Sequence, residues 1–159
     1  MREEDTVAIN DSLSAPADRR ALPDLTDAAT RFPVRAGEDP WTPQEVREIA
    51  DELIAEVDRL TSELAAADEE LSDLLRNSGD GAGDDQADSG SSALEREHEL
   101  TLVNNTRDML EQTTRALARI EAGTFGRCDA CGEAIGKARV QAFPRATLCV
   151  SCKQREERR

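Results

Sequence analysis

Aromatic side chains are scarce in this 159-residue sequence, which contains three Phe, one Trp and no Tyr. Since aromatic residues supply much of the buried area of a large core, this scarcity predicts a thin or small fold. Long apolar runs are missing too, so nothing indicates a membrane-spanning helix. The opening MREEDTVAIN has neither the basic nor the apolar region of an export signal. We therefore expect a cytoplasmic protein with no membrane association.

Catalytic motifs are also missing. The single histidine, His98, stands in HELTL, which lacks the second His of the H-E-x-x-H metalloprotease motif. Leu100 occupies the position where a zinc deaminase needs Glu. No P-loop, nucleophile elbow or dinucleotide-binding glycine motif is present. These absences predict that the protein is not an enzyme and that His98 is an exposed helix residue.

The charge is strongly negative and unevenly distributed. The formal net charge is -14, of which -8 falls in residues 41–77, whereas residues 128–159 carry +3. Negative charge opposes non-specific attraction to nucleic acid or anionic lipid. We therefore expect a partner with a basic surface and no direct sequence-specific DNA binding.

Residues 1–40 contain four prolines, scattered acids and no sustained apolar period. This composition predicts a largely disordered tail. A less favoured alternative is that a short piece such as 28–34 docks on the folded part. Phe32 and Trp41 are the large side chains available for that contact.

A long helix is predicted to begin at WTPQEV. Thr42 is the expected N-cap, Pro43 the first helical residue and Glu45 the partner of the Thr in a capping box. Alternating spacings of four and three residues then separate the apolar positions, which indicates a coiled-coil helix that needs a partner helix. These positions are Val46, Ala50, Leu53, Val57, Leu60, Leu64, Ala67, Leu71 and Leu74.

A second helix is predicted from about Ser92 to Ala122, with Gly123 as its C-cap. Its seam consists of Val103, Thr106, Leu110, Thr113, Leu117 and Ile120. The turn between the helices is short and rich in Gly, Asp and Ser, so residues 41–123 are expected to form an antiparallel coiled-coil hairpin with an acidic tip at 78–92. A parallel homodimer is the alternative; the two threonines of the second seam and the turn chemistry favour a monomer.

All four cysteines lie in two pairs, Cys128 with Cys131 and Cys149 with Cys152. The spacing C-x2-C-x17-C-x2-C fits one tetrahedral four-thiolate zinc site, with Gly132 easing the turn after the first pair. Four thiolates leave no open position, so the zinc is predicted to be structural. Two disulfides are the alternative, but they need an oxidising compartment for which no signal is seen.

Residues 124–159 are thus predicted to be a C4-type zinc finger that ends in a short helix. The metal is expected to supply much of its folding energy, and the apolar residues assigned to its small core are Phe125, Ile135, Val140, Phe143 and Leu148. Basic side chains are in excess here, either to offset the thiolate charge or to contact an acidic partner surface. They are Arg127, Lys137, Arg139, Arg145, Lys153 and Arg155.

Taken together, the hairpin, its acidic tip and the finger resemble the TraR/DksA zinc-finger family of bacterial transcription factors over residues 43–155. The resemblance is carried by F-G-x-C-x-x-C-G-x-x-I-G followed by P and L-C-x-x-C-K. In this sequence those residues are Phe125, Gly126, Cys128, Cys131, Gly132, Ile135, Gly136, Pro144, Leu148, Cys149, Cys152 and Lys153.

The resemblance implies binding to RNA polymerase, with the hairpin entering the secondary channel and the tip acids acting near the catalytic magnesium. The family tip D-x-x-D-x-A is matched by Asp85 and Asp88, whereas Gly90 replaces the final Ala and is expected to make the tip more mobile. A cleavage factor or competitor in the same channel, or a zinc-stapled coiled coil with another partner, is the alternative function.

The resemblance also bears on the alarmone ppGpp. Family members that bind it at the polymerase interface carry basic residues where this sequence has Asn105, Asp108, Gln112 and Phe143, and only Lys153 is retained. We therefore expect little or no ppGpp synergy. Lys153, Arg127 and Arg139 are the candidate contacts to polymerase or ppGpp.

Overall fold

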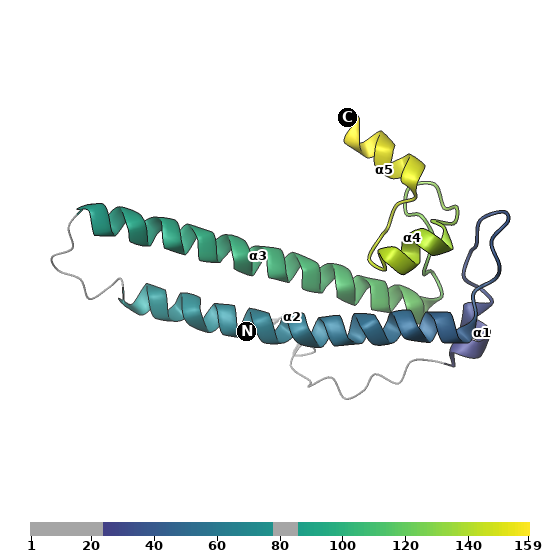
Figure 1. Ribbon diagram of the computed structural model, residues 1–159, viewed down its shortest axis with the longest axis horizontal. Helices are drawn as coiled ribbons and strands as arrows, with labels where there is room; N and C mark the ends of the chain where they lie inside the picture. The colour runs from purple at the N-terminus through teal and green to yellow at the C-terminus, as the bar shows by residue number, and fades with distance from the viewer. Residues whose placement is uncertain (1–23, 78–85) are drawn as a thin grey trace, which may run out of the picture.

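The computed structural model describes residues 24–77 and 86–159, with side chains from residue 90 onward in the second range. Five helices are present there: α1 (Leu25–Ala29), α2 (Pro43–Asn77), α3 (Gln86–Ala122), α4 (Lys137–Ala142) and α5 (Val150–Glu157). Helices α2 and α3 lie side by side as a long rod, and α1, α4 and α5 gather at one end, the base (Figure 1). The predicted fold class, a helical hairpin followed by a four-Cys module, is confirmed.

The N-terminus of α2 is built by the predicted capping box. The backbone N–H of Thr42 donates to Glu45 Oε2 at 2.9 Å, and the backbone N–H of Glu45 donates to Thr42 Oγ1 at 3.2 Å. Two of the N–H groups that a helix start leaves unpaired are thereby satisfied. At 1.5 Å per residue, the 35 residues of α2 make a rod of about 52 Å.

The predicted seams of the two long helices face each other. Val46, Ala50, Leu53 and Leu60 of α2 are buried, as are Val103, Thr113, Leu117 and Ile120 of α3. Farther from the base, Leu64, Leu71 and Leu74 are only half-buried. An ion pair between Arg107 Nη2 and Asp68 Oδ1, 2.9 Å long, also joins the two helices.

Helix α3 ends as predicted but begins earlier. Gly123 follows its last residue with φ +74°, the left-handed conformation expected of a C-cap glycine. The start is at Gln86 rather than near Ser92, so Asp88 lies in the first turn of α3 and Asp85 lies outside the described residues. The low helix propensity of the Ser and Gly residues at 89–92 suggested a turn, but an acidic side chain near a helix N-terminus is favourable.

The prediction of a disordered tail over residues 1–40 is wrong for residues 24–40, whereas residues 1–23 lie outside the described part. Leu25, Ala28, Ala29 and Phe32 are buried in the core at the base. The Phe32 ring packs edge-on against Phe125 with centroids 5.7 Å apart, and Trp41 packs on the same ring at 6.1 Å. The four buried residues of this segment form a third layer over the two long helices and follow the i, i+3, i+4, i+7 spacing of one helix face. Their run covers only eight residues between Pro23 and Pro33, which is shorter than the window that a search for periodicity uses.

The apolar core assigned to the finger needs one correction. Phe125, Ile135 and Val140 are buried and Leu148 is half-buried, but Phe143 is 62% exposed. Phe143 is the C-cap of α4, where the backbone leaves the helix with φ -135°, and Arg139 lies over its ring at 5.9 Å. No described helix is long and apolar enough to cross a membrane.

Candidate metal centre

The four cysteine sulfurs converge on one point at the base of the rod. Their Sγ atoms all lie within 4.8 Å of one another, and none of them forms a disulfide. Cys128 and Cys131 come from the loop after α3, whereas Cys149 is the N-cap of α5 and Cys152 lies in its first turn. This placement brings together the four predicted metal ligands around one point, as a single four-thiolate site requires.

Backbone hydrogen bonds hold the two pairs in register. The N–H of Cys128 donates to the Glu133 carbonyl at 2.8 Å, and the N–H of Gly132 donates back to the Cys128 carbonyl at 2.9 Å. Gly132 has φ +76°, a conformation that other residues rarely adopt, which confirms its predicted role in this turn. The N–H of Asp129 donates to the Thr147 carbonyl at 2.9 Å and so connects the first cysteine pair to the loop before the second.

Cys128 is surrounded by groups that favour its thiolate. Burial acts to raise its pKa, but hydrogen bonds from the backbone N–H groups of Cys149, Cys131 and Ala130 outweigh burial and lower the pKa to about 6. The N–H of Cys149 lies 3.4 Å from Cys128 Sγ. Oriented N–H donors of this kind are typical around metal-bound thiolates, which must be deprotonated to bind.

Cys152 experiences the opposite balance. Burial and the neighbouring sulfurs of Cys149, Cys131 and Cys128 raise the pKa of its thiol to about 12, although Arg155 Nη2 donates to its Sγ at 3.0 Å. Four thiolates at this spacing repel one another unless a cation lies between them. A divalent ion supplies that charge, and four sulfurs in a closed set are the ligands of structural zinc.

The chemistry available at this centre is therefore structural. All four tetrahedral positions of a bound zinc are filled by protein sulfur, so no position remains for water or substrate. The metal would join the loop after α3 to α5 and hold the small module together. The residues that fit this role are Cys128, Cys131, Cys149 and Cys152.

Lys137 connects the finger to the start of the hairpin, a role that the sequence did not reveal. Its Nζ donates to Glu45 Oε2 at 2.8 Å and to the Pro40 carbonyl at 3.3 Å, and it lies 5.0 Å from the centroid of the Trp41 ring. Its backbone N–H donates to Glu38 Oε1 at 3.0 Å. The side chain of Lys137 is 13% exposed, so this contact is shielded from solvent. The capping box predicted that Glu45 stabilises the start of the helix. No local sequence signal connects Glu45 to a lysine ninety-two residues away.

The three predicted contact residues of the finger, Arg127, Arg139 and Lys153, differ in what their side chains contact. Arg127 Nη1 donates to the Gly132 carbonyl at 3.0 Å, and Arg139 Nε donates to the Leu148 carbonyl at 3.2 Å, so both brace the finger itself. Lys153 is exposed on α5 and pairs with Glu156 at 3.0 Å. Helix α5 and the N-terminus of α3, which holds Asp88, lie at opposite ends of the molecule (Figure 1).

The fold and the site define a class of protein, a two-helix rod with a C4 zinc module at its base. The family model described as "Prokaryotic dksA/traR C4-type zinc finger" matches residues 123–158. The solved structure of the transcription factor DksA2 from Pseudomonas aeruginosa has 30% sequence identity and a TM-score of 0.60, with coverage of 72% of this chain and 84% of that one. The chain belongs to the prokaryotic DksA/TraR family of C4-type zinc-finger proteins.

Curated relatives agree over shorter stretches. The RNA polymerase-binding transcription factor DksA of Caulobacter vibrioides is 41% identical over 75 residues, which are 47% of this chain and 53% of the relative. The protein of the same name from Escherichia coli K12 is 38% identical over 63 residues, or 38% and 42% of the two chains. The matched region thus spans about half or less of these relatives' lengths.

Proposed function

We propose that this chain is a non-enzymatic, cytoplasmic regulator of transcription that binds bacterial RNA polymerase as a monomer. The observation that carries the proposal is the combination of hairpin and finger in a fold that aligns with 84% of the DksA2 chain. Two curated relatives, 41% and 38% identical over the stretches that match, are named RNA polymerase-binding transcription factors. The net charge of -14 argues against direct DNA binding as the route to transcription.

In this proposal the zinc finger and the base dock on the polymerase exterior while the hairpin enters the secondary channel. A rod of two helices about 52 Å long has the reach and the slenderness for such a passage. Asp85 and Asp88 would then present carboxylates near a magnesium centre, where an added negative charge has its largest effect. They would shift the balance among polymerase conformations rather than catalyse a reaction.

The tip assignment is tested with the double variant Asp85→Asn and Asp88→Asn. We expect polymerase affinity within about twofold of wild type, since the base is untouched, but loss of the effect on initiation at a regulated promoter. The matched control is Asp80→Asn with Asp84→Asn, which removes the same charge from neighbouring positions in the sequence. Normal regulation by the double variant, or loss in the control alone, would show that the tip assignment is wrong.

The same preparation separates the other functional classes. RNA cleavage in backtracked polymerase complexes would identify a cleavage factor. Displacement of such a factor without any effect on initiation would identify a competitor. A pull-down that recovers another protein and no polymerase subunit would identify a coiled coil with a different partner, and would overturn the proposal.

We further propose that ppGpp has little effect on the activity of this protein. Asn105, Asp108, Gln112 and Phe143 stand where ppGpp-responsive family members are expected to carry basic residues, and an aromatic ring or amide cannot replace a cation for a pyrophosphate. Lys153 is the retained cation, and it already pairs with Glu156. Titration of ppGpp into a promoter-complex assay should change the effect less than about twofold. A strong synergy that is lost in Lys153→Ala would contradict this expectation.

A further inference from the structure

The segment that precedes α2 lies against the finger and forms one side of a cleft beside the metal centre. We call residues 33–41, between the buried Phe32 and the start of α2, the strap. The cleft has a volume of about 360 Å³. Two of the four metal ligands border this space, and its opposite wall comes from a distant part of the chain. The lining includes Val34, Arg35 and Ala36 of the strap and Cys131, Cys149 and Arg155 of the finger.

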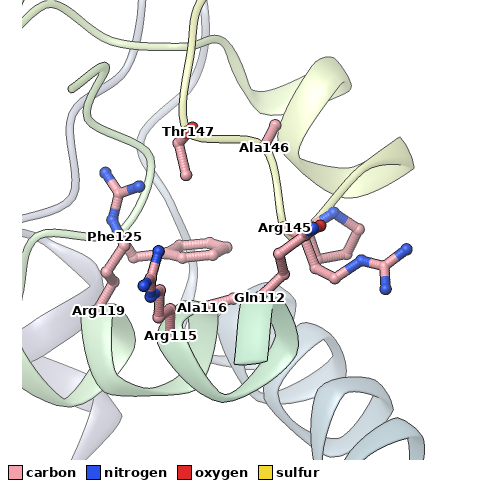
Figure 2. A pocket seen from close by; sticks show the side chains of 9 residues that line it. Gln112, Arg115, Ala116, Arg119, Phe125, Arg145, Ala146 and Thr147 are labelled. Atoms are coloured by element: carbon pink, nitrogen blue, oxygen red, sulfur yellow. The ribbon is translucent and has the colours of Figure 1, made fainter. Parts of the chain in front are cut away.

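Other hollows around the finger give poorer access to the sulfurs. The hollow in Figure 2, between α3 and the loop at 144–147, is lined by no cysteine. Another, of about 430 Å³, is bordered by Cys152. Cys152 is only 5% exposed, however, and its Sγ accepts a hydrogen bond from Arg155 Nη2 at 3.0 Å. Cys131 is exposed and Cys149 is half-buried, so the two least buried cysteines are those that line the cleft beside the strap.

One carboxylate holds the strap against the finger. Arg35 and Glu38 close a tight turn, in which the N–H of Glu38 donates to the Arg35 carbonyl at 3.0 Å and Gly37 has φ +89°. Glu38 Oε2 accepts from the N–H of Arg35 at 2.9 Å, and Glu38 Oε1 accepts from the N–H of Lys137, the first residue of α4, at 3.0 Å. Glu38 therefore connects the turn of the strap to the finger.

The strap and the finger fit closely. A Cβ added to Gly136 would lie only 3.1 Å from Arg35 Cδ, so a larger residue there would push against the strap. Trp41 Nε1 donates to the Pro33 carbonyl at 3.3 Å and joins the two ends of the strap. Hydrogen bonds to an ionised group are stronger than those between neutral groups, so the loss of Glu38 should loosen the strap most.

We propose that the cleft between the strap and the finger is the path by which zinc enters and leaves the centre, and that the strap controls the rate of this exchange. Replacement begins at Cys131 and Cys149. Their thiolates leave the metal one at a time, each takes up a proton, and donor atoms of an incoming chelating molecule occupy the vacated positions. That molecule has to pass the wall formed by residues 34–36. This inference concerns metal retention and does not rest on polymerase binding.

The first experiment measures how fast the zinc-loaded full chain loses its metal to the chromogenic chelator pyridylazoresorcinol. In the wild type the rate should increase with chelator concentration, because the chelator enters the cleft before the metal leaves. Glu38→Ala should increase the rate about tenfold, and Glu38→Gln, which keeps an oxygen acceptor for Lys137, less than about threefold. Asp39→Asn removes a neighbouring exposed acid of the strap and is the matched control, with an unchanged rate.

Two results of this experiment would overturn the proposal. A release rate that does not depend on chelator concentration, in the wild type or in Glu38→Ala, would mean that the metal leaves by unfolding of the finger. An unchanged rate in Glu38→Ala would mean that the strap does not control exchange.

The second experiment compares the two routes to the sulfurs with one bulky side chain placed in each. Ala36→Trp puts an indole in the cleft beside the strap, and Glu156→Trp puts the same group in the hollow bordered by Cys152. Both positions are exposed, so both variants should fold and bind one zinc per chain. Ala36→Trp should slow metal release at least about threefold and Glu156→Trp should leave it unchanged. Slowing by Glu156→Trp, or no slowing by Ala36→Trp, would show that the metal does not leave through the cleft.

Discussion

The base and the tip half of the rod carry the same heptad pattern but bury it to different depths. At the base, Val46 and Ile120 are fully buried, because the segment 24–41 and the finger add a third layer over the two helices. Toward the tip, Leu64 and Leu71 are half-buried, since among the described residues only the two helices contact each other there. The same heptad pattern thus forms part of a packed core at one end and a slender pair of helices at the other.

The difference shows how a small chain with few aromatic residues obtains both stability and reach. All three phenylalanines and the tryptophan lie at the base or in the finger, and Phe32, Trp41 and Phe125 pack together. The tip half depends on leucines at single seam positions, and the Arg107–Asp68 ion pair adds little at more than 40% exposure of both side chains. The two regions should therefore respond very differently to matched substitutions.

The largest effect is expected from loss of a metal ligand. Cys128→Ser should abolish stoichiometric zinc binding and unfold the finger, because structural zinc contributes on the order of 10 kcal/mol to such modules. The environment of Trp41 should change with it, since Trp41 contacts Phe125 and Lys137 of the finger side. Zinc content and Trp fluorescence measure this, while far-ultraviolet circular dichroism should still show most of the helix content.

Ser151→Ala, a neighbouring substitution at an exposed position, is the control and should retain zinc and native fluorescence. If Cys128→Ser kept one zinc per chain and an unchanged Trp41 signal, the closed four-thiolate site would be refuted. A complete loss of helix content would show instead that the two long helices need the folded finger. That result would contradict the view that the base and the tip half are stabilised separately.

An intermediate effect is expected from truncation of the third layer. Phe32→Ala should lower the free energy of unfolding by about 3 kcal/mol, because it leaves a cavity in a closed core. Leu71→Ala, in the half-buried seam of the tip half, should cost only about 1 kcal/mol. Urea unfolding of the zinc-loaded protein measures both. Equal destabilisation by the two substitutions would mean that side chains at the base and in the tip half contribute equally to stability, which contradicts the difference in their burial.

The smallest effect concerns the contact between Glu45 and Lys137. Hydrogen bonds from Lys137 and from the Thr42 N–H hold the pKa of Glu45 below its ordinary value of 4.5. Since the folded-state pKa is lowered, this stabilisation is present above about pH 4.5 and is lost as the pH falls through the folded-state value. Glu45→Gln should therefore cost about 1 kcal/mol at pH 7 and less as the pH falls below 4.5.

The control for this pH dependence is Glu52→Gln, an exposed substitution on the same helix. It should change the free energy of unfolding by less than about 0.5 kcal/mol across the range. A Glu45→Gln cost that is constant with pH would mean that the carboxylate charge is not what stabilises the junction.

Sequence patterns were sufficient to predict the parts of the structure that are specified by neighbouring residues or by metal chemistry. The capping box at Thr42 and Glu45, the C-cap at Gly123 and the spacing of the four cysteines each specify their structure within a few residues or by metal chemistry. The unbroken periodicity of the two seams predicted that the helices pair, and the short turn between them predicted the antiparallel direction.

The parts that could not be predicted depend on contacts between distant residues. Phe32, Trp41 and Phe125 meet only once the chain has folded, so the docked segment 24–40 looked like a tail. Phe143 looked like core because its apolar character does not reveal which way a helix C-cap turns.

The most direct test of the account is site-specific crosslinking from the tip. A photo-crosslinking residue at Ser89, introduced into the zinc-loaded full chain and irradiated with RNA polymerase, should capture segments that line the secondary channel near the active centre. The same residue at Arg31, at the base, should capture only exterior segments or nothing. Crosslinks from Ser89 to the polymerase exterior alone, or to no polymerase subunit while the chain is bound, would contradict insertion of the hairpin.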